Sequence, residues 1–148
     1  MVDKYDLAEL ATLEVGSGIV NGTIRPHFTG PYVGCDMFAG RGVDFVADAE
    51  DLKLGDNTLT TVISTEMLEH CPRPWRAMQE MARVASQFVV VTARGYDQRG
   101  CWEVHGYPND YYRFFHTSMR LLAEDAGLTV LELDADPEGP GWMMVCKK

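Results

Sequence analysis

The chain has 148 residues, of which 46% are hydrophobic and 24% charged, values typical of one globular domain with a sizeable core. Its net charge of −9 argues against sequence-independent binding to DNA or RNA, which needs clustered Lys and Arg. No apolar run approaches the about 20 residues of a membrane span, the N-terminus lacks the apolar core of a signal peptide, and no CxxC pair is present. We therefore expect a cytoplasmic protein without nucleic-acid, membrane or metal partners.

Short apolar runs rich in β-branched residues recur along the chain, and each is bounded by Gly, Pro, Asp or Asn. They predict strands at residues 11–15, 32–35, 43–47, 59–64, 88–92, 128–133 and 142–146. The last two are separated by a turn rich in Asp, Pro and Gly, which favours a closing antiparallel pair.

Two segments between these strands have the apolar period of helices, residues 74–85 and 117–126. Pro74 suits a first helical turn, while Thr117 and Gly127 are typical of an N-cap and of a helix stop. Strands that alternate with helices predict an α/β fold with parallel strands joined by crossovers. We expect a single domain over residues 1–148.

A glycine loop follows the first predicted strand, at the strand end where α/β sheets bind ligands. Gly16-Ser17-Gly18 lets the backbone adopt positive φ and approach a ligand. The dinucleotide fingerprint G-x-G-x-x-G is incomplete, however, because its third glycine would fall at Asn21. Any helix after this loop is limited by Pro26.

Carboxylates lie at or near the ends of the first three predicted strands, at Glu14, Asp36 and Asp48. Asp36 can accept both hydroxyls of a ribose, and Asp48 can accept a hydrogen bond from an exocyclic amine such as that of adenine. Each alone is equally typical of a turn or a cap. Glu14 would repel a diphosphate in a low-dielectric cleft and attract an ammonium or sulfonium group. Together the three acids favour S-adenosylmethionine (SAM).

Several stretches resemble the class I SAM-dependent methyltransferases: "LEVGSG", "YVGCDM", "DFVADAEDLKLGDNTLTTVISTEMLEH" and "PWRAMQEMARV". "HGYPNDYYRF" and "LLAEDAGLTVLEL" are similar to small bacterial and phage-type members of the methyltransferase type 11-like group. The resemblance implies a Rossmann-like fold with a seven-stranded, mostly parallel sheet in the order 3-2-1-4-5-7-6. It also implies an antiparallel seventh strand, helices on both faces and a minimal N-terminus.

Carried over from that resemblance, the glycine loop would shape the methionine part of the cofactor site and Asp36 would hold the ribose. Asp48 would face the adenine, and the residues after the fourth strand would form the wall near the reactive methyl group. The cofactor-binding residues expected are Glu14, Gly16, Ser17, Gly18, Asp36, Met37, Asp48, Ala49, Thr65 and Glu66. The chain departs from the family pattern at the third loop glycine, which is Val20, and at the helix after the loop, which Pro26 truncates. Together with the nearly absent helix before the first strand and the loss of the Pro-Gly-Gly turn before the fifth, these departures suggest a more open pocket.

The segment from about residue 94 to residue 116 is long and aromatic, as functional lids often are. His105 is the best candidate for a base, because imidazole exchanges protons near neutral pH, although its ring could equally bind a loop carbonyl. His70 is a second candidate, with the alternative that it shapes the cofactor wall.

Tyr107, Tyr112 and Arg113 in the same segment are candidates for binding an anionic or sugar acceptor. Arg113 could instead pair with Asp110 and fix the loop.

These observations favour a SAM-dependent methyltransferase acting on a small-molecule or glycan acceptor. One alternative is a degenerate relative that binds SAM or a nucleoside without catalysis. Another is a nicotinamide-dependent oxidoreductase, against which Asn21 and Glu14 both count.

Overall fold

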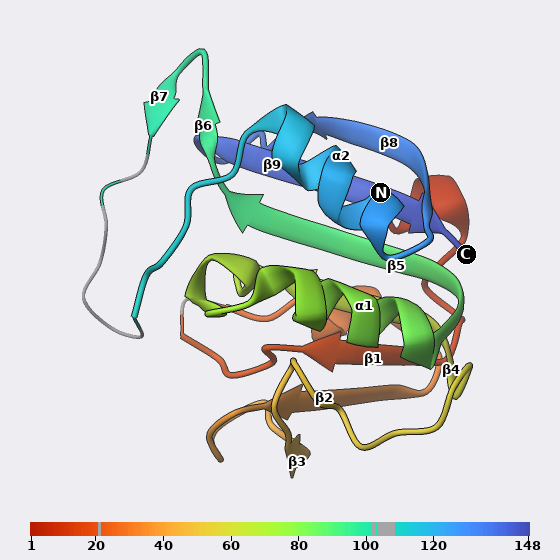
Figure 1. The fold of residues 1–148 in the computed structure, drawn as a ribbon. Coiled ribbons are helices and arrows are strands. Elements are labelled where there is room, and N and C mark those ends of the chain that lie inside the picture. The colour runs from red at the N-terminus through yellow and green to blue at the C-terminus, as the bar shows by residue number, and fades with distance from the viewer. Residues whose placement is uncertain (21, 102, 104–108) are drawn as a thin grey trace.

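The computed structural model describes residues 1–20, 22–101, 103 and 109–148, and its main feature is one twisted sheet (Figure 1). The strands of this sheet are β1 (Thr12–Val15), β2 (Tyr32–Asp36), β3 (Phe45–Val46), β4 (Leu59–Thr65), β5 (Ala85–Arg94), β8 (Thr129–Ala135) and β9 (Gly141–Lys147). Their order is β3-β2-β1-β4-β5-β9-β8, and β9 runs antiparallel to both of its neighbours. The predicted order 3-2-1-4-5-7-6 is therefore confirmed. Strands β6 (Tyr96–Asp97) and β7 (Gly100–Cys101) form a separate hairpin.

Alternate residues of the central strands enter two separate hydrophobic clusters, one on each face of the sheet. In β5, Val89 and Val91 belong to the larger cluster and Val90 to the smaller one. The larger cluster includes Met78 of α1 (Pro74–Val84) and Met119 of α2 (His116–Asp125). Figure 1 shows both helices on this face.

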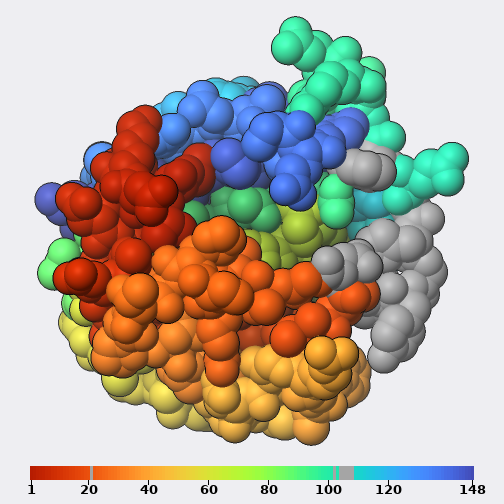
Figure 2. Space-filling model, turned by 180° about the vertical axis from the view of Figure 1, so that it is seen from behind, coloured from red at the N-terminus to blue at the C-terminus, as the bar shows by residue number. Residues whose placement is uncertain are grey.

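The opposite face has no α-helix among the described residues, which corrects the expectation of helices on both faces. It is covered by the 3-10 turns η1 (Asp3–Tyr5) and η2 (Arg25–His27) and their flanking segments, through buried Leu7 and Phe28. Figure 2 shows these N-terminal segments over that face. The connection from β1 to β2 contains several glycines and Pro26, which disfavour an α-helix.

Element boundaries mostly lie within two residues of the predicted ones. The third strand is shorter than predicted and spans Phe45–Val46. The cap of α2 also differs from the prediction, because Phe115 occupies the N-cap position and its N–H donates to Ser118 Oγ at 2.8 Å. Gly127 does follow the C-cap of α2 with φ +76°, as expected. No described helix has the length and apolarity needed to cross a membrane.

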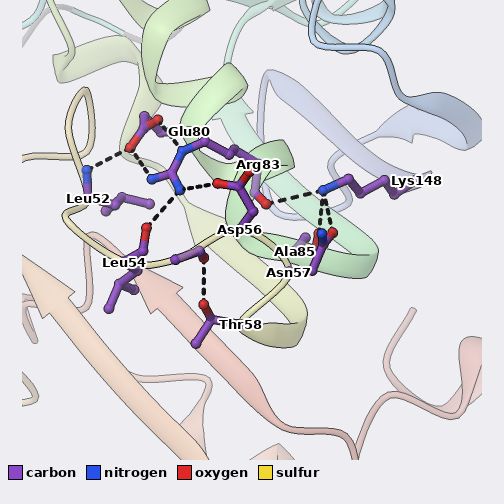
Figure 3. A network of polar contacts seen from close by, with 10 residues as sticks. Leu52, Leu54, Asp56, Asn57, Thr58, Glu80, Arg83, Ala85 and Lys148 are labelled. Carbon is purple, nitrogen blue, oxygen red and sulfur yellow. Dashed lines mark hydrogen bonds and ion pairs between the residues drawn. The ribbon is translucent and has the colours of Figure 1, made fainter.

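A polar network joins the end of α1 to the start of β5, at the amino-terminal edge of the parallel strands (Figure 3). Arg83 pairs with Glu80 and Asp56, and its Nη1 donates to the Leu54 carbonyl at 2.7 Å. Lys148 Nζ donates to the Ala85 carbonyl at 2.8 Å. This edge is closed by internal contacts, so the loops at the opposite, carboxyl-terminal edge are the ones available to form a site.

Candidate active site

A cleft of about 830 Å³ lies at the carboxyl ends of β1, β2 and β4, within the range of small-molecule sites. We call it the strand-tip cleft. The predicted site residues that line it are Glu14, Gly16, Ser17, Gly18, Asp36, Met37, Ala49, Thr65, Glu66 and His70. Asp48 does not line it, although Ala47 and Ala49 do. The cleft therefore gathers most of the predicted cofactor residues from four separate segments of the chain.

The glycine loop folds back tightly on the tip of β2. Gly16 has φ +83°, and a Cβ there would lie 2.7 Å from Met67 Cγ, so only glycine fits without displacement. A Cβ on Gly18 would lie 2.9 Å from Asp36 Oδ2, the atom that accepts a hydrogen bond from the Gly18 N–H at 3.1 Å. The absent side chains allow the loop backbone to form one wall of the cleft.

Glu14 is 5% exposed, and its Oε2 accepts a hydrogen bond from the Tyr32 hydroxyl at 2.8 Å. Burial raises the pKa of Glu14, while the Tyr32 hydrogen bond and the Arg25 charge act in the opposite direction. Arg25 itself lies over the Tyr32 ring, 5.1 Å from its centroid. The wall beside the glycine loop thus carries an acid, which suits a cationic ligand better than a diphosphate.

Asp36 and Asp48, the two acids after β2 and β3, differ in what they can offer a ligand. Asp36 lines the cleft, and its oxygens accept single hydrogen bonds from Gly18 N and from Phe38 N, the latter at 3.2 Å. Each carboxylate oxygen has two lone pairs, so Asp36 retains acceptor capacity for ribose hydroxyls. Asp48 Oδ1 accepts from Glu50 N at 2.9 Å, which is the turn role considered as its alternative. Its contact with adenine stays a prediction.

The ends of β4 and β5 form the other half of the cleft. Glu66 follows β4 with φ +52°, a left-handed conformation that is costly for a side-chain-bearing residue. Its N–H donates to the Thr92 carbonyl at 3.0 Å, and its Oε1 accepts from Thr92 Oγ1 at 2.9 Å. Its second carboxylate oxygen pairs with Arg94. Both oxygens of Glu66 are therefore engaged with β5.

Glu69 is a cleft residue that the sequence reasoning missed. It lies in the 3-10 turn η3 (Leu68–His70), lines the cleft and is 0% exposed. No side chain in the described part of the chain hydrogen-bonds either carboxyl oxygen, and the backbone N–H groups of Glu69 and Arg94 act on it to lower its pKa. Burial, reinforced by the neighbouring Glu66 charge, raises the pKa of Glu69 to about 8. The only sequence signal is its position three residues after Glu66, which places it in the same turn.

The end of the predicted lid docks on η3. The Tyr111 N–H donates to the Glu69 carbonyl at 2.8 Å, and His70 Nδ1 lies 3.0 Å from the Asn109 carbonyl. His70 also lines the cleft, and both its role as a base and its role in shaping the cofactor wall stay predictions. His105 and Tyr107 lie outside the described residues, and their roles as base and acceptor contact stay predictions.

The start of the predicted lid forms the β6–β7 hairpin. Arg99, in its turn, pairs with the buried Asp97 and donates to the Asp136 carbonyl at 2.6 Å. Asp136 belongs to the β8–β9 turn and lines the cleft. The hairpin is thus fastened to one rim of the cleft.

Tyr112 and Arg113 do not line the strand-tip cleft. They line a second hollow of about 500 Å³ beside α1 and α2. The Tyr112 hydroxyl donates to the Pro72 carbonyl at 2.9 Å, and Arg113 pairs with Asp110, which is the loop-fixing alternative. Their contact with an acceptor stays a prediction.

A comparison with protein-family models identifies the chain. The model described as "Methyltransferase domain" matches residues 13–88, slightly more than half of the 148 residues. The chain belongs to this methyltransferase family. It is therefore a SAM-dependent enzyme, and the nicotinamide-dependent hypothesis is set aside. No curated protein matches the sequence.

Solved structures of methyltransferases share the fold along nearly the whole chain. A SAM-dependent methyltransferase from Aquifex aeolicus has a TM-score of 0.74 and 17% identity, covering 99% of this chain and 86% of its own. The Burkholderia thailandensis 1,6-didemethyltoxoflavin-N1-methyltransferase, determined with S-adenosylhomocysteine (SAH), has a TM-score of 0.77, 14% identity and coverages of 99% and 74%.

A third structure is the magnesium protoporphyrin IX methyltransferase of Synechocystis PCC 6803 with bound SAH. Its TM-score is 0.68, its identity is 13%, and the coverages are 99% of this chain and 78% of its own. At these identities the likeness establishes the fold, and the residue roles depend on the cleft itself.

Proposed function

We propose that this methyltransferase binds SAM in the strand-tip cleft and transfers its methyl group to a small-molecule or glycan acceptor. The observation that carries the proposal is the contact between the glycine loop and the end of β2. There, Gly18 and Asp36 meet at 3.1 Å beside a cleft of about 830 Å³.

The chain's residues fit this cofactor along the length of the cleft. The buried acid Glu14 and the backbone of Gly16 would face its cationic amino-acid end, and Asp36 would accept from its ribose hydroxyls. Ala47 and Ala49 leave room for the adenine beyond β3. When bound, the cofactor supplies an electrophilic methyl group on a sulfonium. Thr65 and Glu66 would form the wall of the cleft beside this methyl group and hold the reacting partners in line.

Two observations support a small acceptor. The net charge of −9 opposes a polyanionic nucleic acid. The Burkholderia and Synechocystis enzymes of the same fold are named for small-molecule substrates. A glycan acceptor would present hydroxyl groups of the same chemistry to the cleft.

Isothermal titration calorimetry with SAM and SAH tests cofactor binding. We expect both to bind the wild-type protein and Asp36→Asn to weaken binding by about tenfold or more, the equivalent of about 1.4 kcal/mol. The matched control is Asp3→Asn, on exposed η1 far from the cleft, which should bind like the wild type. Absence of binding at millimolar ligand, or equal affinity in Asp36→Asn, would contradict the proposal.

The acceptor class is tested by supplying SAM with a labelled methyl group and comparing pools of phenols, sugars, RNA and protein. We expect label in the small molecules or sugars. Label confined to RNA or protein would contradict the acceptor assignment while leaving the cofactor site intact.

A further inference from the structure

The glutamates that line the strand-tip cleft differ in how their carboxyl oxygens are used. Glu14 accepts from the Tyr32 hydroxyl, and Glu66 is held by Thr92 and Arg94. Glu69 is the most deeply buried of these, at 0% exposed, and no described side chain hydrogen-bonds its oxygens; the backbone N–H groups of Glu69 and Arg94 act on them.

An isolated buried carboxyl costs free energy, because its polar atoms leave water without gaining partners. Native proteins keep few such groups, and those they keep concentrate at functional sites. An apolar residue of similar size would fill the same space without the cost of burying a carboxyl group. Its position at the floor of the ligand cleft is therefore evidence for a ligand contact.

The charged side chains around Glu69 do not supply a hydrogen-bond partner. Glu66, directly after β4, pairs with Arg94 of β5. From the segment before α2 comes Arg113, which pairs with Asp110. On its own turn lies the buried Cys71, whose pKa burial raises to about 12, so this thiol stays neutral. A protonated Glu69 beside these pairs leaves the local charge balanced.

We propose that Glu69 receives the hydroxyl of the acceptor and takes up its proton during methyl transfer, so that the enzyme methylates oxygen. This inference rests on the proposed function and names the acceptor chemistry of the same site. It places the reacting end of the cleft at the tips of β4 and β5.

The hydroxyl oxygen forms the new bond to the methyl carbon, and the bond from that carbon to the cofactor sulfur breaks. The sulfur keeps the electron pair of the broken bond. The hydroxyl proton passes to Glu69 in its ionised form, whose population grows as the pH rises towards 8, and Glu69 later returns this proton to solvent.

A hydroxyl suits this residue better than an amine does. A neutral amine attacks through its lone pair without prior loss of a proton, whereas a hydroxyl is a weak nucleophile until a base accepts its proton. A base works best when its pKa lies near the operating pH. The raised pKa of about 8 gives Glu69 more basicity than an exposed carboxylate has.

The first test follows Glu69 itself, in protein carrying ¹³C at the glutamate side-chain carboxyls. Subtracting the Glu69→Gln spectrum assigns the Glu69 signal in the SAH complex, and Glu69→Asp serves if that variant does not fold. We expect Glu69 to titrate near pH 8 and its signal to move when phenol is added. A titration near the ordinary pKa of glutamate, or no response to phenol, would overturn the proposal. So would a signal that moves only with added Mg²⁺ and is restored by EDTA.

The second test compares transfer to phenol, aniline and thiophenol. Glu69→Gln should lower transfer to phenol by about 100-fold while SAH affinity stays unchanged, and the exposed control Glu124→Gln should behave like the wild type. Undiminished transfer to phenol in Glu69→Gln, or transfer to aniline alone, would overturn the oxygen assignment. Failure of the wild type to bind SAH would instead defeat the proposed function on which this inference rests.

Discussion

The two halves of the strand-tip cleft differ in how completely their acids are satisfied. At the tips of β1 and β2, Glu14 and Asp36 accept hydrogen bonds from Tyr32 and Gly18. At the tips of β4 and β5, Glu69 has no side-chain hydrogen-bond partner among the described residues. The acids of the first half are held by hydrogen bonds before any ligand arrives, whereas the second half keeps a buried acid without a side-chain partner. The difference assigns cofactor binding to one half and acceptor chemistry to the other.

The largest expected effect comes from breaking the organised half at Gly16. In Gly16→Ala the methyl group would require φ +83° and lie 2.7 Å from Met67 Cγ. We expect a loss of about 3 kcal/mol in the free energy of unfolding, together with weaker SAH binding. Denaturant unfolding and calorimetry measure the two effects.

The matched control for that change is Gly40→Ala, in the loop after β2. A Cβ on Gly40 would meet nothing within 4 Å, so this variant should keep both stability and SAH affinity. Equal stability and equal SAH affinity in the two variants would show that the glycine loop is not closely packed.

The second effect tests the contrast between the two halves of the cleft by removing Glu69, the buried acid without a side-chain partner. Burial raises the pKa of Glu69 to about 8 from the ordinary glutamate value of 4.5, so the folded protein binds one proton more than the unfolded chain between these values. Stability from this group is therefore lost as pH rises from about 4.5 towards 8. Glu69→Gln removes this dependence, and we expect its advantage over the wild type to grow by roughly 2 kcal/mol between about pH 6 and about pH 8.

Urea unfolding of both proteins at several pH values measures this difference. Contributions from Glu66, Arg94, Arg113 and Cys71 are present in both proteins and largely cancel. Parallel stability curves for wild type and Glu69→Gln would mean that Glu69 is not held as an unpaired buried acid.

The smallest effect concerns the network at the other edge of the sheet (Figure 3). Arg83→Met breaks the pairs with Glu80 and Asp56 and leaves the Leu54 carbonyl without this donor. Because Arg83 is partly exposed, we expect a loss of only about 1 kcal/mol in stability, with SAH affinity unchanged. The exposed Arg76→Met on the same helix is the control and should have no effect. A fall in SAH affinity in Arg83→Met would show that the two edges are coupled.

The sequence predicted the organised half well, because its signals are local. Gly16, Gly18 and Asp36 each follow a recognisable apolar strand, and parallel strands bring their carboxyl ends to one edge. The strand order was available from the resemblance of the motifs. The lack of an α-helix on one face of the sheet was harder to predict from the sequence. It depends on how strongly Pro26 and the nearby glycines disfavour a helix where other members of the fold could form one.

The acceptor half was less predictable, because its features depend on tertiary contacts. Glu69 is one of several acids in the sequence, and only the 3-10 turn after β4 shows that it is buried without a side-chain partner. The hydrogen bond of the Glu69 carbonyl with Tyr111 joins residues 42 positions apart by their numbering. No local pattern marks such a contact, nor the placement of Tyr112 and Arg113 in a separate hollow.

The most direct test of this account is a crystal structure of the protein with SAH. We predict the ribose hydroxyls within hydrogen-bonding distance of Asp36 and the sulfur facing the tips of β4 and β5, on the side of Glu69. SAH bound in the hollow beside α1 and α2, or bound in the cleft with its sulfur directed away from Glu69, would contradict it.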